Sequence, residues 1–135
     1  MLHPRTEHDT LRLRATLTWN DRQVHLSALH PMPPLSSAFS RARDQALQDE
    51  ARHLAQAGGL AVMAGDLNTT PWARSLWGAE PAPMRRAGMA LPTWPNAWGW
   101  LSVLPLDHVL ATDGWQVVES HTGPDLGSDH RPVVV

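Results

Sequence analysis

Apolar and polar residues alternate along the chain from Thr10 to Trp19, where leucine, alanine and tryptophan occupy every second position. This period of two predicts a half-buried β-strand. The sequence Asn20-Asp21-Arg22 is typical of a tight turn, and a second alternating run from Val24 to Leu29 follows it. We therefore expect the two strands to pair as an antiparallel hairpin.

The next segment has the period of a helix. Ser36 or Ser37 is a suitable N-cap for a helix that runs to about Ala57, and Gly58-Gly59 is a natural stop. The short apolar run 60–64 then follows the helix directly. It predicts a central strand that is buried on both faces.

The second half of the chain is less regular. Residues 79–105 are rich in proline, glycine and tryptophan and predict a long loop that carries a short strand near Thr93-Trp94. Residues 104–111 and 115–120 resemble strands, and the Asp-Gly pair between them suits a hairpin turn. Residues 133–135 predict a final strand.

Composition limits the classes of protein that this chain can be. Its 135 residues are enough for one core, and 42% hydrophobic with 18% charged residues excludes disorder. The net charge of −2 argues against a general nucleic-acid binder. The absence of cysteine excludes disulfides and thiolate metal sites but fits any compartment. We expect neither a signal peptide nor a membrane span in this sequence, and the compartment stays open.

Polar side chains that could carry chemistry follow the predicted strands. Asp66 and Asn68 come after the apolar run, where a carboxylate and an amide two positions apart can face one side. The same pattern also makes Asx turns, so a structural interpretation is open as well. His30 lies at the end of a predicted strand, before a proline-rich segment. That position suits catalysis, although a histidine in a stiff loop is also a common structural feature.

Asp107 is flanked by apolar residues on a predicted inner strand. Burial of its charge is costly without a partner, and His130 is the obvious one. Such a pair orients the imidazole and leaves its other ring nitrogen for a substrate or water, while a purely structural bond is the alternative. Asp129, directly before His130, adds a second carboxylate that could bind a metal ion. His108 would point to the opposite face of the strand, so we leave it out of the site.

Four short segments together resemble the motifs of the endonuclease/exonuclease/phosphatase superfamily, in the family's order. They are His30-Pro31, Gly65-Asp66-Leu67-Asn68, Leu106-Asp107-His108-Val109 and Ser128-Asp129-His130-Arg131-Pro132. The resemblance covers residues 10–135, is closest to uncharacterised bacterial members, and leaves residues 1–9 unassigned. It implies an α/β fold with one mixed β-sheet and flanking helices, the second half of a four-layer α/β sandwich.

The resemblance also implies roles for single residues. Asp66 and Asn68 would contact the nucleophilic water and the scissile phosphate, and Asp129 with Asp66 would hold Mg²⁺ or Mn²⁺. His130, oriented by Asp107, would act as general base or bind the phosphate. His30 would stabilise the transition state or assist the leaving group. The implied activity is hydrolysis of a phosphodiester or phosphomonoester without a nucleotide cofactor, with DNA, RNA, lipid, inositol phosphate and nucleotide substrates all open.

The sequence departs from the family pattern in its first half. That half brings an asparagine and a metal-binding glutamate, and no segment before Thr10 can play either part; Glu7 lies in a polar opening without a strand. We therefore expect a truncated enzyme, with a non-catalytic remnant as the alternative. The inward residues Leu11, Leu13, Leu26 and Val62 would then lack a partner sheet. A missing N-terminal half or self-association should cover them.

Overall fold

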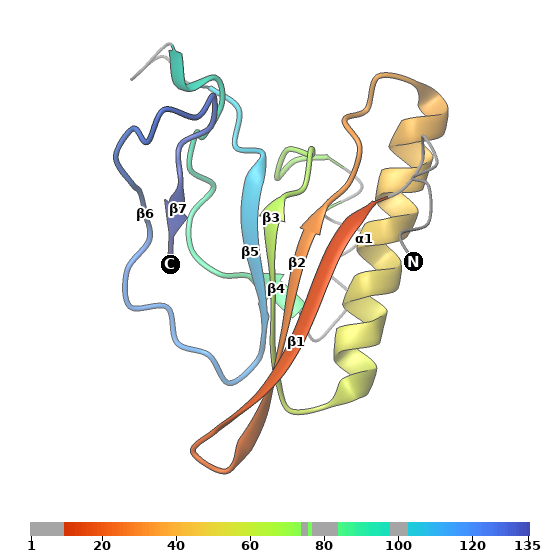
Figure 1. The fold of residues 1–135 in the computed structure, drawn as a ribbon, viewed down its shortest axis with the longest axis vertical. Helices are drawn as coiled ribbons and strands as arrows, with labels where there is room; N and C mark the ends of the chain where they lie inside the picture. The colour runs from red at the N-terminus through yellow and green to blue at the C-terminus, as the bar shows by residue number, and fades with distance from the viewer. Residues whose placement is uncertain (1–9, 74–75, 77–83, 98–102) are drawn as a thin grey trace, which may run out of the picture.

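The computed structural model describes residues 10–73, 76, 84–97 and 103–135. Within them lie the strands β1 (Leu11–Trp19) and β2 (Arg22–His30), the helix α1 (Ser37–Ala57), and the strands β3 (Leu60–Asp66), β4 (Met84–Arg86), β5 (Asp107–Thr112), β6 (His121–Thr122) and β7 (Val133–Val134). Five strands form one sheet in the order β1-β2-β3-β5-β4 (Figure 1). β2 and β3 are parallel and the other neighbours antiparallel. The fold is α/β with a mixed sheet, as predicted.

The predicted hairpin of β1 and β2 is confirmed. The two strands pair along their full lengths and end at Trp19 opposite Arg22. Asn20 and Asp21 both have positive φ, 49° and 59°, which a two-residue hairpin turn requires and which these residue types tolerate.

Helix α1 also has the predicted limits. It begins where the Ser36 hydroxyl accepts a hydrogen bond from the Phe39 N–H (3.1 Å) and ends at Gly58, which has a φ of 73°. Its apolar side packs on one face of the sheet and forms a fully buried core, which includes Leu29, Leu47, Ala51, Leu54, Met63 and Leu110. Within the described residues, no helix combines the length and apolar character that a membrane span needs.

The opposite face of the sheet is largely uncovered, so the prediction of a half-buried first strand is wrong. Every residue of β1 is exposed, and Leu13 retains 71% of its accessible surface. In β3, Ala61 and Met63 are buried on the α1 side, whereas Val62 on the other side is only partly covered. The prediction that this strand is buried on both faces is therefore also wrong. Among the described residues no second sheet lies over the apolar side chains of β1.

The predicted hairpin through Asp113-Gly114 is wrong as well. Both edges of β5 are occupied, by β3 and β4, so residues 115–120 have no free edge of it to pair with and form no strand. Instead Trp115 stacks on Trp19, with ring centroids 6.3 Å apart. β4 lies inside the predicted loop of residues 79–105. The final strand is present as β7, which pairs with β6 in a separate sheet beyond β5 and away from α1 (Figure 1).

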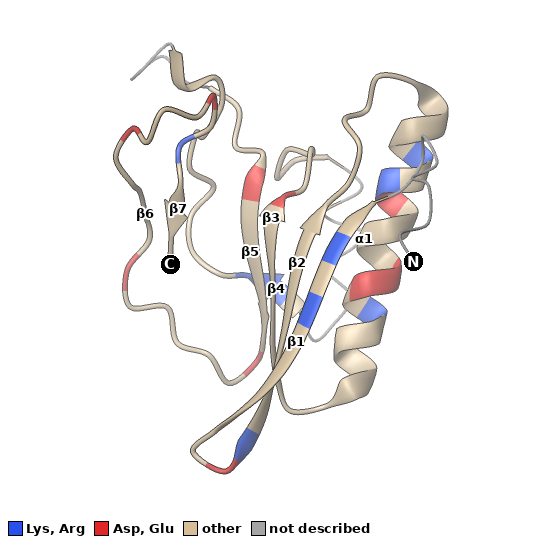
Figure 2. Cartoon of the chain, in the orientation of Figure 1, with Lys and Arg blue, Asp and Glu red and all other residues tan. Residues whose placement is uncertain are grey.

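A buried acidic side chain ties α1 to the hairpin. Glu50 is fully buried and forms ion pairs with Arg12 (2.7 Å) and Arg14 (2.6 Å), and the Ser27 hydroxyl donates to it (2.7 Å). Figure 2 shows basic segments of β1 beside acidic turns of α1. Burial raises the pKa of Glu50, but hydrogen bonds from Arg14 and Ser27 and the charges of both arginines outweigh it and hold the pKa below its usual range. The carboxylate therefore stays ionised.

We expect Glu50→Gln to lower the free energy of unfolding by about 1–3 kcal/mol, because it leaves the arginines without a counter-charge. Since the folded-state pKa of Glu50 is lowered, its contribution is present above the unfolded pKa and is lost as pH falls through the folded value. Denaturant unfolding should therefore show a smaller difference in unfolding free energy between the parent and Glu50→Gln at about pH 3 than at about pH 7. The exposed neighbour variant Asp49→Asn is the control. A Glu50→Gln effect that is independent of pH would contradict the charge-based explanation.

The uncovered sheet face should bind a hydrophobic dye such as anilinonaphthalene sulfonate, because adjacent apolar side chains remain in contact with water. Leu13→Ser should reduce the dye fluorescence. Leu35→Ser is the matched control, since Leu35 is 79% exposed but lies outside the sheet. A parent chain that binds no dye would show that the face is covered in solution.

Candidate active site

The strand register places two acidic side chains opposite each other. Asp66 is the last residue of β3, and its partner across the ladder is Asp107, the first residue of β5. Cross-strand partners point to the same face of a sheet, and like charges in this position destabilise it. A positive group beside the pair would offset that repulsion.

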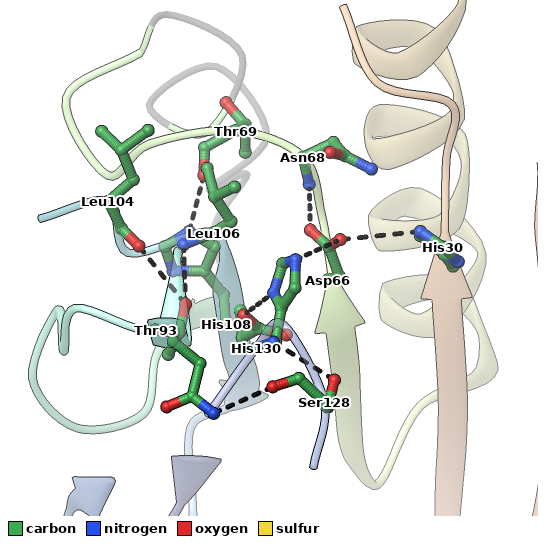
Figure 3. Close-up of polar contacts among 12 residues, drawn as sticks. His30, Asp66, Asn68, Thr69, Thr93, Leu104, Leu106, His108, Ser128 and His130 are labelled. Carbon is green, nitrogen blue, oxygen red and sulfur yellow. Dashed lines mark hydrogen bonds and ion pairs between the residues drawn. The ribbon is translucent and has the colours of Figure 1, made fainter. Parts of the chain in front are cut away.

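His130 lies against both carboxylates. Its Nδ1 is 2.8 Å from Asp107 Oδ2, and its Nε2 is 3.8 Å from Asp66 Oδ2 (Figure 3). The predicted Asp107–His130 pair is thus confirmed. Burial alone would lower the pKa of His130, but the hydrogen bond to Asp107 and the charges of Asp107, Asp66 and Asp129 outweigh burial and raise the pKa.

His30 approaches Asp66 from β2. Its Nε2 is 3.6 Å from Asp66 Oδ2, and its side chain is 55% exposed. In Figure 3, His30 and His130 reach Asp66 from different sides. The carboxylate of Asp66 therefore lies between two imidazoles, that of His30 at the end of β2 and that of His130 on the loop before β7.

The turn after β3 is an Asx turn. The Asn68 N–H donates to Asp66 Oδ1 (2.9 Å), and Asn68 has a φ of 48°. Its amide also donates to the Pro31 carbonyl (2.9 Å), which ties this turn to the end of β2. The structural interpretation of the pair is thus present, and the contact of Asn68 with a phosphate stays a prediction.

Close approach of β2 and β3 also requires a glycine before Asp66. Gly65 has a φ of 149°, and a Cβ there would lie 2.1 Å from the Leu29 carbonyl oxygen. Burial, the largest effect, and the charge of Asp107 together raise the pKa of Asp66, against the opposing hydrogen bond from the Asn68 N–H. A neighbouring cation would therefore stabilise the ionised form of Asp66.

One cavity of about 770 Å³ joins the predicted residues, and its lining includes His30, Asp66, Asn68, Asp107, Asp129 and His130. Asp129 is exposed, and its carbonyl oxygen accepts a hydrogen bond from the Asn96 N–H (2.7 Å). All six predicted residues therefore face a common space at the end of the sheet. Their chemical roles stay predictions.

Asp66, Asp107 and His130 form a group that could hold a metal ion, with one ligand atom from each lying within 4.8 Å of the others. Carboxylate oxygens are the ligands that Mg²⁺ and Mn²⁺ prefer. In the described part of the chain the candidate metal group thus combines Asp66 with Asp107 and His130, whereas the sequence paired Asp66 with Asp129. The role of Asp129 as a ligand stays a prediction.

His108 lies outside the site. It is buried, and its Nε2 lies 2.8 Å from the Thr69 carbonyl oxygen. Burial lowers the pKa of His108 and favours the neutral ring. Its placement on the opposite face of β5 from Asp107 agrees with the alternation along a strand.

Sequence reasoning missed the residues that anchor the loop of His130. The Asn96 amide donates to the Ser128 carbonyl (2.9 Å), and the Thr93 carbonyl accepts from the Arg131 N–H (2.9 Å). The Thr93 hydroxyl also accepts from the Leu106 N–H (3.2 Å), directly before Asp107. The short strand predicted near Thr93-Trp94 is present as a single bridge between Trp94 and Leu104. The segment has no clear period, so the sequence contained no signal for its contacts with the loop of His130.

Comparison with known proteins shows the family and the fold of this chain. The sequence model for the Endonuclease/Exonuclease/phosphatase family matches residues 2–130. Among solved structures, an endonuclease/exonuclease/phosphatase from Beutenbergia cavernae has 22% identity and a TM-score of 0.72, with 90% of this chain and 37% of that chain covered. No curated protein matches the sequence significantly.

Two further solved structures show the same fold. A conserved protein of unknown function from Enterococcus faecalis has 18% identity and a TM-score of 0.72, with 98% of this chain and 57% of that chain covered. TDP2 from D. rerio, solved with a single-strand DNA product, has 15% identity and a TM-score of 0.68, with 95% and 61% covered. The chain thus spans about half the length of these proteins.

We expect Asp107→Asn to lower the pKa of His130 and to cost about 1–3 kcal/mol of stability, because a charged hydrogen bond is lost. The raised folded-state pKa means that this stabilisation is present below the unfolded pKa of histidine and is lost as pH rises through the folded value. NMR titration of the His130 ring and denaturant unfolding measure both effects.

Asp113→Asn is the control, since Asp113 is an exposed aspartate just after β5. An Asp107→Asn variant that is as stable as the parent, with an unchanged His130 titration, would remove the pair from the site.

Proposed function

Because this chain belongs to the endonuclease/exonuclease/phosphatase family, we propose that it carries one side of the active site of a Mg²⁺- or Mn²⁺-dependent phosphoester hydrolase. The observation that supports this most strongly is the convergence of His30, Asp66, Asp107 and His130 on one cavity. These side chains come from three adjacent strands and one loop, so the fold positions all of them together.

His130 is the proposed proton acceptor. Asp107 holds Nδ1, so Nε2 is left to take a proton from water or to contact a phosphate oxygen. Asp66 lies beside that nitrogen at 3.8 Å and orients the water from the other side. The raised pKa of His130 suits a base that must hold a proton after the transfer.

The cation would be held by the carboxylates of Asp66 and Asp107, with Asp129 in reach of the same cavity. Their oxygen atoms fit a hard divalent ion, and the repulsion between the two opposed aspartates is relieved by one. The chemistry that such a cation supplies when bound is polarisation of the phosphate and of its attacking water.

His30 and Asn68 are the proposed contacts to the phosphate. The exposed imidazole of His30 can donate to a phosphate oxygen or to the leaving group. An amide nitrogen has two N–H groups, so Asn68 can keep its bond to the Pro31 carbonyl and donate the second hydrogen to the substrate. The bond to Pro31 thereby stabilises the position of Asn68 before substrate binds.

The proposed substrate is a phosphate ester. A relative with this fold was solved with a single-strand DNA product. The net charge of −2 means that this chain has no general attraction for nucleic acid, so binding would depend on contacts at the phosphate itself. We therefore propose phosphoester hydrolysis as the reaction, without a preference for one class of substrate.

We expect the 135-residue chain alone to hydrolyse bis-p-nitrophenyl phosphate very slowly with Mg²⁺ or Mn²⁺, because its ligand groups leave a cation largely hydrated and weakly held. Adding the first half of a family domain, as one polypeptide or as a co-expressed fragment, should restore activity. Asp66→Ala and His130→Ala should then reduce kcat by about 10²-fold or more.

His121→Ala is the control, because His121 is an exposed histidine of β6 that takes no part in the metal group. Strong activity of the 135-residue chain alone would show that its site needs no residues from a further half-domain. A restored protein that is indifferent to both substitutions would refute the site itself and favour a non-catalytic remnant.

A further inference from the structure

In the described part of the chain, the outer side of β1 is a long sheet edge without a partner strand. Among the described residues only β2 pairs with this strand, and the ladder is continuous over nine residue pairs. The strand contains neither proline nor glycine nor a bulge, the features that usually protect an edge from pairing. At the other end of the sheet β4 has only three residues. The two edges therefore differ sharply in their capacity to bind another strand.

The charges of β1 do not protect this edge either. Arg12 and Arg14 are the charged residues of the strand, and both are engaged by the buried carboxylate of Glu50 at 2.6–2.8 Å. A charge that is already paired and held toward α1 is a weak barrier to an approaching strand.

The turn geometry determines which backbone groups point outward. In a two-residue hairpin the closing pair, here Trp19 and Arg22, is a hydrogen-bonded pair, and such pairs alternate along the ladder. Odd-numbered residues of β1 therefore bond to β2. Arg12, Arg14, Thr16 and Thr18 direct their N–H and C=O groups to the open edge.

We propose that this edge pairs antiparallel with β1 of a second copy of the chain, about a two-fold axis at Ala15. In that register Arg14 lies opposite the partner's Thr16, and Arg12 lies opposite the partner's Thr18. All outward backbone groups then find partners, and no arginine faces an arginine. Moving the axis to Arg14 would place two Arg14 side chains opposite each other, and like charges there are unfavourable.

The side chains on the uncovered face match in the same register. Leu13 lies opposite the partner's Leu17, and Leu11 lies opposite the partner's Trp19. In the single chain these four side chains are 41–71% exposed. Each exposed apolar side chain thus meets an apolar one, which is the pairing that stabilises adjacent strands. This inference is independent of the proposed function, because none of these residues lines the cavity of His130.

Light scattering coupled to size-exclusion chromatography tests the register through Ala15. The parent chain should be a dimer. Ala15→Glu and Ala15→Lys should each weaken self-association more than about tenfold, because like charges then meet at the axis. Mixing the two variants should restore a one-to-one heterodimer. Ala15→Thr is the conservative control and should remain dimeric.

A second variant separates edge pairing from packing of the uncovered faces. Thr16→Pro removes an outward N–H and leaves the backbone hydrogen bonds of β1 to β2, although it loses the exposed contact of the Thr16 hydroxyl with His25 (3.0 Å), so it should give a folded monomer. Circular dichroism and the His130 NMR signal confirm folding. A monomeric parent, a dimer that survives both Ala15→Glu and Thr16→Pro, or Glu and Lys variants that do not recombine would each overturn the proposal.

Discussion

The repulsion between Asp66 and Asp107 is the constraint around which the site is organised. Antiparallel pairing of β3 and β5 makes these two residues direct partners, so neither can move away without shifting the central ladder. His130 offsets one charge through a 2.8 Å contact, and His30 lies at 3.6 Å on the other side of Asp66. Two histidines and two aspartates thus meet at one end of the sheet, where a cation would stabilise the two carboxylates further.

The rest of the fold keeps that arrangement in place. Gly65 allows the close approach to the Leu29 carbonyl oxygen that sets the end of β3 beside the end of β2. Glu50 anchors α1 to the hairpin that carries His30. The core forms on the α1 side of the sheet, while the other face retains exposed leucines. The described residues thus hold the candidate site on a sheet of which α1 covers one face.

The sequence predicted the local elements and the Asp107–His130 contact better than the long-range packing. Alternation and capping residues located β1, β2 and α1, and the isolated acid in an apolar segment predicted the Asp107–His130 pair. The hairpin after β5 was wrong because local turn preference says nothing about which strands already occupy the edges of β5. The metal group around Asp107 depends on ladder register, and register is not encoded in any short motif.

Mn²⁺ binding, followed by paramagnetic broadening of the histidine ring signals in NMR spectra, tests the cation site most directly. At about 1 mM Mn²⁺, we expect selective broadening of His130 and His30 relative to His121 of β6, and loss of that selectivity in Asp66→Asn. Equal broadening of all three histidines, or the same selectivity after Asp66→Asn, would contradict a cation site at the opposed aspartates.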